Sequence, residues 1–387
     1  MTANVTSIAK VRAAARDRAE RLRVNNRTAT MLLVLAVVLV VIGLGATQSA
    51  SSVVAIDQAQ DRFYYFKRQL IGVGIGTVAL LVTSRVPYRL YRRLAVPAFF
   101  ATVALLLAVL AVGPVIGGSQ RWLHIGGFSF QPSELAKVAV VFVLAHILEK
   151  KQKLLTRFGH FLVPVLFTVG VLGGLVIMQP DLGTTIIIGA AAMAVIMASD
   201  TPIRYVLLLS VLVVAAAWVL AFSDEYRVDR IVGFLDPWNN SSGEGYQLIQ
   251  GYYALSNGGL FGVGLGASRA RWFYLPNAHT DFIFAIIGEE TGLIGGLTVI
   301  GLFVVLALAG WLVAARAPDR FGRMVAAGLT AWLSFQALVN IGGVLGVMPI
   351  TGIALPFVSY GSSALIVSMA SLGILVNIAQ AGVQPRK

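Results

Sequence analysis

The chain contains no cysteine, so disulfide bonds and thiolate metal sites are excluded. Charged residues are also scarce, at 12% of the chain, and only 17 of the 387 residues are acidic. Apolar residues take their place, with a hydrophobic content of 57% and a mean hydropathy of +0.82. A water-soluble protein could not solvate such a surface, so the sequence predicts an all-α protein that crosses a membrane many times.

Ten apolar segments are long enough, or nearly long enough, to cross a lipid bilayer. They span residues 30–48, 69–86, 95–113, 132–149, 161–179, 184–198, 203–222, 283–313, 324–346 and 362–380. The first of them is too long for a cleavable signal peptide and is followed by no cleavage site. We therefore expect a tail over residues 1–29, one ten-helix membrane domain over 30–381 and a short tail over 382–387.

Lysine and arginine are distributed unevenly between the two sides of this topology. The side that holds both termini carries 21 of them and the other side eight, while Lys137 lies within the fourth segment. By the positive-inside rule, both termini are cytoplasmic, and the long loop over residues 223–281 faces outward. This asymmetry accounts for most of the net charge of +13, so we expect no nucleic-acid partner. The basic stretch 11–27 is interpreted as a helix that either lies on anionic lipid or serves only as a topology signal.

The outward side carries the unusual polar residues. Glu134 and Lys137 lie three residues apart on one helix face, which is typical either of a structural ion pair or of a lysine that contacts an anionic substrate. Arg121 and Trp122 are interpreted either as ligand contacts or as an interfacial anchor. Arginines of the long loop, which include Arg227 and Arg230, favour an anionic partner at the outer leaflet.

The most informative stretch is YLPNAHTDFIF over residues 274–284, where His279 and Asp281 stand at the edge of the eighth apolar segment. Ionisable groups at membrane depth usually serve function. Thr280 and Asp281 at a helix start are also typical of an N-cap, so capping is expected at least as a minor role of Asp281. Eight helical residues separate Asp281 from Glu289 by about 12 Å along the axis.

Glycosidases that use two carboxylates hold them roughly 5–9.5 Å apart, so Asp281 and Glu289 do not form such a pair unless the helix between them is broken. Asp281 would have to act alone. A lone base suits a substrate whose leaving group is already a phosphate, because a phosphate departs without being protonated.

The ordered motifs YLPNAHTDFIFAIIGEETGLIGG, GFLDPW, GYQLIQ, GSQRWL, QPSELAKVAV, QPDLGTT and LPFVSYGSSALI resemble those of the SEDS family (shape, elongation, division and sporulation). The resemblance runs from about residue 30 to residue 380. It implies a ten-helix enzyme that polymerises lipid II into peptidoglycan strands at the outer face of the bacterial plasma membrane. Its implied partners are a class B penicillin-binding protein and other membrane proteins of the division machinery.

The resemblance also implies roles for individual residues. Asp281 is the implied catalytic residue, and our hypothesis is that it acts as a general base toward the acceptor sugar while undecaprenyl diphosphate leaves with inversion. The substrate-binding residues that we expect are Arg121, Trp122, Glu134, Lys137, Arg227, Arg230, His279, Thr280 and Ser359. The sequence assigns no definite cofactor; a divalent cation, Mg²⁺ or Mn²⁺, could assist the reaction, although no ligand cluster is visible in the sequence.

The branch of the family is indicated by the middle of the chain, which is similar to the division branch typified by FtsW. The motif PITGIALPFVSYGSSALIV leans instead toward the elongation branch typified by RodA. Thr351 and Asn277 stand where many division-branch members have Lys and Glu, so roles built on those residues do not apply here. A lipid II transporter and a scaffold without catalytic activity are the alternatives from other functional classes.

Overall fold

A computed structural model describes residues 2–116, 118–126, 128–222, 225–272 and 274–381. Their regular secondary structure is helical, apart from one short antiparallel β-ribbon that pairs Leu123 with Phe130. The elements, in chain order, are α1 (Thr2–Ala59), α2 (Tyr64–Arg85), α3 (Arg89–Val112), β1 (Leu123–Ile125), β2 (Phe128–Phe130), α4 (Pro132–Lys150), the 3-10 turn η1 (Gln152–Leu154), α5 (Phe158–Ile177), α6 (Leu182–Met197), α7 (Ile203–Ala221), α8 (Glu225–Leu235), α9 (Glu244–Gly258), α10 (Ile283–Ala315), α11 (Arg320–Val344) and α12 (Ser362–Ala381).

Each of the ten predicted apolar segments overlaps one of these helices over nearly its whole length, so the predicted all-α polytopic architecture is confirmed. In the described part of the chain, seven helices are long and apolar enough to cross a membrane: α1, α2, α3, α5, α10, α11 and α12. Helices α6 and α7 are apolar but shorter, and α4 carries buried charges. That these three also span the membrane stays a prediction.

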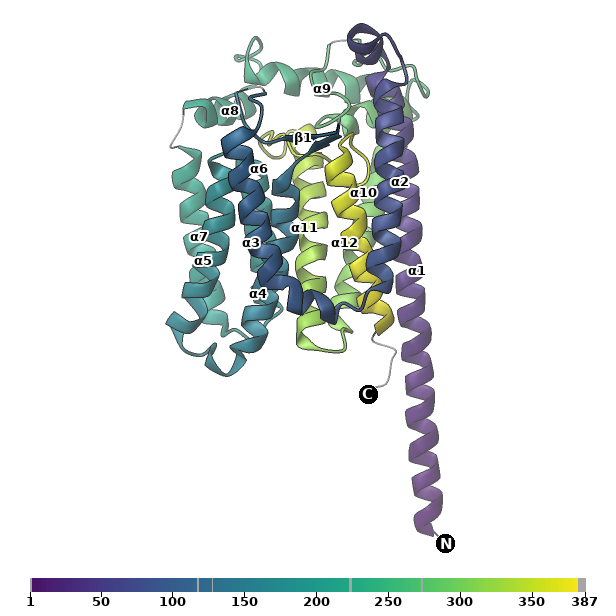
Figure 1. The fold of residues 1–387 in the computed structure, drawn as a ribbon. Helices are drawn as coiled ribbons and strands as arrows, with labels where there is room; N and C mark the ends of the chain where they lie inside the picture. Colours follow the sequence, from purple (N-terminus) through teal and green to yellow (C-terminus); the bar gives the residue numbers. More distant parts are fainter. Residues whose placement is uncertain (1, 117, 127, 223–224, 273, 382–387) are drawn as a thin grey trace.

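The ten helices run side by side, with α8, α9 and the β-ribbon gathered at one end of the bundle (Figure 1). Helix α1 begins, and helix α12 ends, at the opposite end, as an even number of crossings requires. The basic stretch 11–27 continues directly into the apolar part of α1 as one helix. The long loop predicted over residues 223–281 thus lies at the end away from the termini and contains α8 and α9.

Burial divides the helices into inner and outer ones. In α11 and α12, 78% and 72% of an apolar 18-residue stretch is buried inside the protein, compared with 22% of such a stretch in α2 and 28% in α3. Outer helices can leave one face apolar and exposed because lipid, rather than water, would cover it. The segment that joins α11 to α12 is therefore held by the best-packed part of the fold, and it contains the predicted site residue Ser359.

Helix α10 is interrupted at Gly292, whose φ of 68° and ψ of −166° are not helical. Backbone groups that the break leaves without a helical partner must be satisfied elsewhere. The loop after α9 does this, since the N–H groups of Val263 and Gly264 donate to the carbonyls of Glu289 and Glu290 at 2.9 and 3.1 Å. The long loop and the outer end of α10 therefore form one hydrogen-bonded unit.

The side chains of the same two glutamates strengthen this unit. Glu289 is fully buried and accepts hydrogen bonds from the Ser268 hydroxyl at 2.5 Å and from the N–H groups of Arg269 and Ala270 at 3.2 and 3.3 Å. Glu290 accepts from the Ser49 hydroxyl of α1 and from the Ser268 N–H. Both carboxylates anchor the loop that leads to Asp281.

Candidate active site

Asp281 lies just outside α10 and does not cap it. The N-cap position is Phe282, and no side chain caps this end of the helix. The expected capping role of Asp281 is therefore wrong. The backbone N–H groups of Thr280, Asp281 and Phe282 instead converge on the carbonyl of Asn277, at 3.0, 3.1 and 3.3 Å. This compact turn ends the loop before the helix starts and leaves the carboxylate of Asp281 available.

Three successive carbonyls of the turn are held by residues from α11 and from the segment after it. The carbonyl of His279 accepts from the N–H of Tyr360 at 3.0 Å, and that of Thr280 accepts from the Ser359 hydroxyl at 2.6 Å. The carbonyl of Asp281 accepts from the side-chain amide of Asn340 at 2.8 Å. Each such bond contributes about 1 kcal/mol, and together they restrict the orientation of the Asp281 side chain.

The segment between α11 and α12 is held by the same side chains. Asn340 also donates to the carbonyl of Ile353 at 2.7 Å, and the Ser359 hydroxyl accepts from the N–H of Leu355 at 2.8 Å. A crevice lined by Asp281, Asn340, Thr351 and other residues lies between the two segments. Ser359, which was predicted to bind substrate, uses its hydroxyl within the protein, and Asn340 was not predicted at all.

The electrostatic surroundings of Asp281 have opposing parts. Burial raises the pKa of its carboxyl from 3.8 to about 6, and the nearby carboxylate of Asp181 acts in the same direction. Arg230 and Arg121 act against this rise because their positive charges favour the ionised form. Within the described residues, no donor is hydrogen-bonded to the Asp281 carboxylate. The group is thus a stronger base than an ordinary aspartate and is still mostly ionised at neutral pH.

The positive charges of Arg121 and Arg230 thus act on Asp281, while the binding of substrate by these arginines stays a prediction. The guanidinium of Arg121 donates to the carbonyls of Gln179, at 3.1 Å, and of Pro180, which places it against the turn between α5 and α6. Arg230 lies on α8. Arg227 lies on the same helix, but its side chain is outside the described residues.

Asp181 is a neighbour of Asp281 that was not predicted for the site. Its carboxylate caps α6 by accepting from the N–H and the hydroxyl of Thr184, both at 2.9 Å. It also accepts from the side-chain amide of Gln131 at 3.4 Å. Because its oxygens are already hydrogen-bonded, Asp181 is a structural cap whose charge reaches Asp281.

His279 packs among aromatic rings. Its ring centroid lies 4.9 Å from that of Tyr65 and 5.6 Å from that of Tyr360. Burial lowers the pKa of His279 to about 4, so the imidazole is neutral at physiological pH. It can exchange hydrogen bonds with a substrate but does not supply a positive charge.

Trp122 lines a different hollow, a groove of about 550 Å³ between α2, the β-ribbon and the start of α12. Arg68, His124 and Tyr360 line the same groove. Because Tyr360 also contacts His279, the groove borders the turn that carries Asp281. Thr280 lies in that turn, and its hydroxyl donates to the carbonyl of Asn277 at 3.1 Å.

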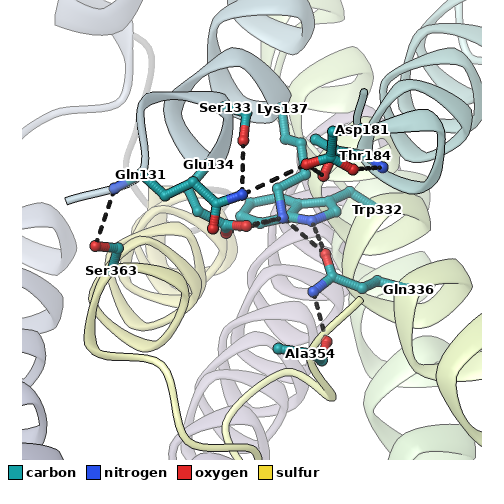
Figure 2. A network of polar contacts seen from close by, with 10 residues as sticks. All are labelled: Gln131, Ser133, Glu134, Lys137, Asp181, Thr184, Trp332, Gln336, Ala354 and Ser363. Atoms are coloured by element: carbon teal, nitrogen blue, oxygen red, sulfur yellow. Dashed lines mark hydrogen bonds and ion pairs between the residues drawn. The ribbon is translucent and has the colours of Figure 1, made fainter. Parts of the chain in front are cut away.

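Glu134 and Lys137 lie in a buried polar network rather than on an open surface (Figure 2). The ammonium of Lys137 is fully buried, 2.8 Å from Glu134 and 2.8 Å from the side-chain carbonyl of Gln336, with the ring of Trp332 at 4.9 Å. Gln336 in turn donates to the carbonyl of Ala354 at 2.8 Å. The structural ion pair is therefore the alternative that these contacts favour, and the network supports the segment beside Asp281.

No group of three or more His, Asp or Glu side chains is placed to hold a metal ion in the part of the chain that the structure describes. Asn340 could have been found from the sequence, because it is a polar residue inside an apolar segment. Asp181 belongs to the motif QPDLGTT, but its electrostatic effect on Asp281, 100 residues further along the chain, is seen only in the structure.

Comparison with known proteins identifies relatives over most of the chain. The model of the cell cycle protein family that comprises FtsW, RodA and SpoVE matches residues 29–383. The chain is 40% identical over 350 residues to a probable peptidoglycan glycosyltransferase FtsW of Geobacter metallireducens, covering 90% of this chain and 93% of that protein. It is also 40% identical over 354 residues to stage V sporulation protein E of Bacillus subtilis, covering 90% and 96%.

Solved structures share the fold. A chain from a structure described as "Structural coordination of polymerization and crosslinking by a peptidoglycan synthase complex" aligns with a TM-score of 0.74 and 28% identity, over 92% of this chain and 98% of that one. The rod shape determining protein RodA of Thermus thermophilus aligns with a TM-score of 0.67 and 26% identity, over 92% and 97%. Since the family model covers nearly all of the sequence, this chain belongs to the FtsW, RodA and SpoVE family of cell cycle proteins.

Proposed function

We propose that this chain is a peptidoglycan glycosyltransferase that polymerises lipid II during cell division, with Asp281 as its general base. The relative from Geobacter metallireducens is named a probable peptidoglycan glycosyltransferase FtsW, and its similarity extends over nine tenths of both chains. The observation that carries the catalytic assignment is the carboxylate of Asp281. It is fixed by the hydrogen-bonded turn, has no hydrogen-bond donor among the described residues, and has a pKa raised to about 6.

In the reaction, Asp281 accepts the proton of the 4-hydroxyl of the acceptor's N-acetylglucosamine. The oxygen forms a bond to the anomeric carbon of the donor's N-acetylmuramic acid, with inversion. The bond between that carbon and the lipid diphosphate breaks, and the diphosphate keeps the electron pair. A pKa near 6 suits this step, because the base is ionised at neutral pH and yet holds a proton better than an exposed aspartate.

The leaving diphosphate requires positive charge rather than an acid. Arg121 and Arg230 are our candidates, since both lie close enough to Asp281 to influence its pKa. Planar guanidinium groups bind phosphate oxygens in pairs, which suits a diphosphate better than a single ammonium would. The fully buried Lys137 is a weaker candidate for direct contact, because its ammonium already has two partners.

The reaction would take place at the outer face of the bacterial plasma membrane, where the loop with α8 and α9 is expected to lie. A transpeptidase of the class B penicillin-binding type is the proposed partner, because a related chain belongs to a complex that couples polymerisation to crosslinking. The division role rests on the FtsW-named relative. If it is right, depletion of the protein gives long undivided filaments, whereas loss of an elongation enzyme gives rounded cells.

A polymerisation assay tests the catalytic proposal. The protein is purified with its transpeptidase partner, the partner's own active site is inactivated, and lipid II is supplied in detergent. Wild type should form glycan polymer, and Asp281→Ala and Asp281→Asn should each form it at least about 100-fold more slowly. Asp61→Asn is the matched control, since Asp61 is a carboxylate of the α1–α2 loop, paired with Lys67 at 2.8 Å.

The outcomes separate the possible functions. Absence of polymer from wild type would overturn the enzymatic proposal, and transfer of lipid II across a vesicle membrane without polymer would favour a transporter. Full activity of both Asp281 variants would remove its role as the base. For the diphosphate, Arg121→Ala should slow turnover, and Arg121→Lys should restore part of it because the charge is kept.

A further inference from the structure

A second groove lies on another side of the protein, between α1, α10 and the loop that precedes Asp281. It has a volume of about 490 Å³ and does not include Asp281. Its residues are Val41, Ile42, Gly45, Ala46, Gln48, Ser49, Ser52, Arg62, Leu265, Gly266, Arg271, Ile287, Glu290 and Thr291. The proposed reaction uses none of them.

The lining of this groove changes character along the membrane normal. Toward the middle of α1 it is apolar, at Val41, Ile42 and Gly45, and toward the outer end of α1 it becomes polar, at Gln48 and Ser52. The span from Val41 to Ser52 is about 16 Å of helix, which is about half the thickness of a hydrocarbon core. The groove therefore has the depth of one leaflet, with its polar end outward.

Two arginines stand at the polar end. Arg62 lies in the α1–α2 loop and Arg271 in the loop before Asp281. Neither guanidinium lies within 4.0 Å of a carboxylate among the described residues. Arg271 makes one long hydrogen bond, at 3.4 Å to the Ser49 hydroxyl, and its buried Nε–H has no acceptor in the described part of the chain.

Glu290 is the carboxylate that lines the groove, and it is already engaged. It is 95% buried and accepts hydrogen bonds from Ser49 and from the N–H of Ser268. The groove thus combines a leaflet-deep apolar wall with two cations, of which one has a buried donor without an acceptor. An unpaired cation at the membrane interface attracts anionic headgroups.

We propose that this groove binds an anionic glycerophospholipid of the outer leaflet, with its phosphate at Arg62 and Arg271 and an acyl chain along Val41 and Gly45. The phosphate supplies the acceptor that Arg271 Nε–H lacks. The acyl chain fills the apolar part, where Val41 is 62% exposed. The proposal is independent of the polymerase reaction and is tested without lipid II.

The glycines of α1 and α2 offer a matched pair of variants. A Cβ added at Gly45 meets no atom within 4 Å, so a side chain that starts there has open space at its base and extends from a residue that lines the groove. A Cβ added at Gly74 of α2 also meets nothing within 4 Å, but Gly74 does not line the groove. Gly45→Leu should block the acyl chain, whereas Gly74→Leu makes the same change elsewhere.

The measurement is native mass spectrometry of delipidated protein in detergent, titrated with phosphatidylglycerol, with phosphatidylcholine of the same acyl chains, or with inorganic phosphate. Wild type and Gly74→Leu should retain one phosphatidylglycerol more tightly than phosphatidylcholine. The double variant Arg62→Gln and Arg271→Gln should weaken this binding about tenfold or more. Gly45→Leu should weaken the binding of both lipids, and unchanged gel-filtration profiles confirm that the variants are folded.

Three results would overturn the proposal. One is equal retention of phosphatidylglycerol by wild type, the double arginine variant and Gly45→Leu. Another is a thermal-unfolding experiment in which inorganic phosphate stabilises the protein at least as much as phosphatidylglycerol does, which would indicate a site for free anions. The third is loss of the copurified partner protein from Gly45→Leu with unchanged lipid binding, which would assign the groove to a membrane helix of the partner.

Discussion

Replacement of Asp281 by asparagine should stabilise the protein while it abolishes polymerisation. Burial raises the pKa of the carboxyl from 3.8 to about 6, so the folded protein binds this proton more tightly than the unfolded chain does. The ionised form is therefore disfavoured by folding, and the cost is complete above pH 6 and absent below pH 3.8. At 1.36 kcal/mol per pKa unit, it amounts to about 3 kcal/mol at pH 8 and about 1 kcal/mol at pH 4.5.

Asparagine has nearly the same shape and does not ionise, so it removes this cost. The gain over wild type should thus be about 3 kcal/mol at pH 8 and should shrink as the pH falls. Thermal unfolding in detergent between pH 4.5 and 8 measures it as a rise in melting temperature that depends on pH. A substitution that raises stability while it removes activity is typical of active-site residues whose native state costs the protein stability.

The stability of Asp281→Asn must be compared with that of wild type at each pH. The reason is that a falling pH destabilises the folded state through His279, whereas it relieves the cost of burying ionised Asp281. Its pKa is lowered to about 4 by burial, so the folded state loses stability as the pH falls from 6.5 toward 4. Wild type and Asp281→Asn share His279, and its contribution cancels in their difference.

Asp61→Asn is the control for the substitution itself. The pKa of Asp61 is lowered by its hydrogen bond with Lys67, so its replacement should give no gain at pH 8. Two results would refute the reasoning: no stabilisation by Asp281→Asn at pH 8, or a gain that is equally large at pH 4.5.

Other consequences follow from the same contacts. The polymerisation rate should be level above about pH 6 and should fall about tenfold per pH unit below it, because protonated Asp281 cannot accept a proton; a rate that is flat from pH 5 to 7 would contradict this role. Gly43→Ala should lower the melting temperature, since a Cβ there would lie 2.6 Å from backbone atoms of the segment before α12. Gly45→Ala is the control and should leave the melting temperature unchanged, because a Cβ there meets nothing within 4 Å. Equal melting temperatures for the two variants would count against this packing. Glu134→Gln or Lys137→Met alone should each reduce stability by about 3–5 kcal/mol, because one buried charge is left unpaired. The double variant should be more stable than either single one in the same unfolding assay, and additive losses would show that the two charges are not coupled.

The membrane architecture could be predicted from the sequence, because it depends on local properties. Long apolar runs form helices in a bilayer, where each backbone group must find its partner within the segment. The ten predicted segments follow from composition. The placement of both termini at the same end of the bundle follows from the even number of segments and from the distribution of lysine and arginine. The ordered motifs likewise identified the family and singled out Asp281.

The state of Asp281 could be decided only by the tertiary structure. A Thr-Asp pair before an apolar run predicted a helix cap, but the side-chain amide of Asn340, 59 residues away, and the Ser359 hydroxyl, 79 residues from Thr280, hold the turn in another conformation. Burial, two arginines and Asp181 then determine how strongly the carboxylate binds a proton. Likewise, the sequence leaves Lys137 as either a contact for an anionic substrate or half of a structural ion pair, and its buried contacts with Glu134 and with Gln336 of α11 favour the second. Such contacts join residues far apart in the chain, so local pattern determined the helices and long-range packing determined the chemistry.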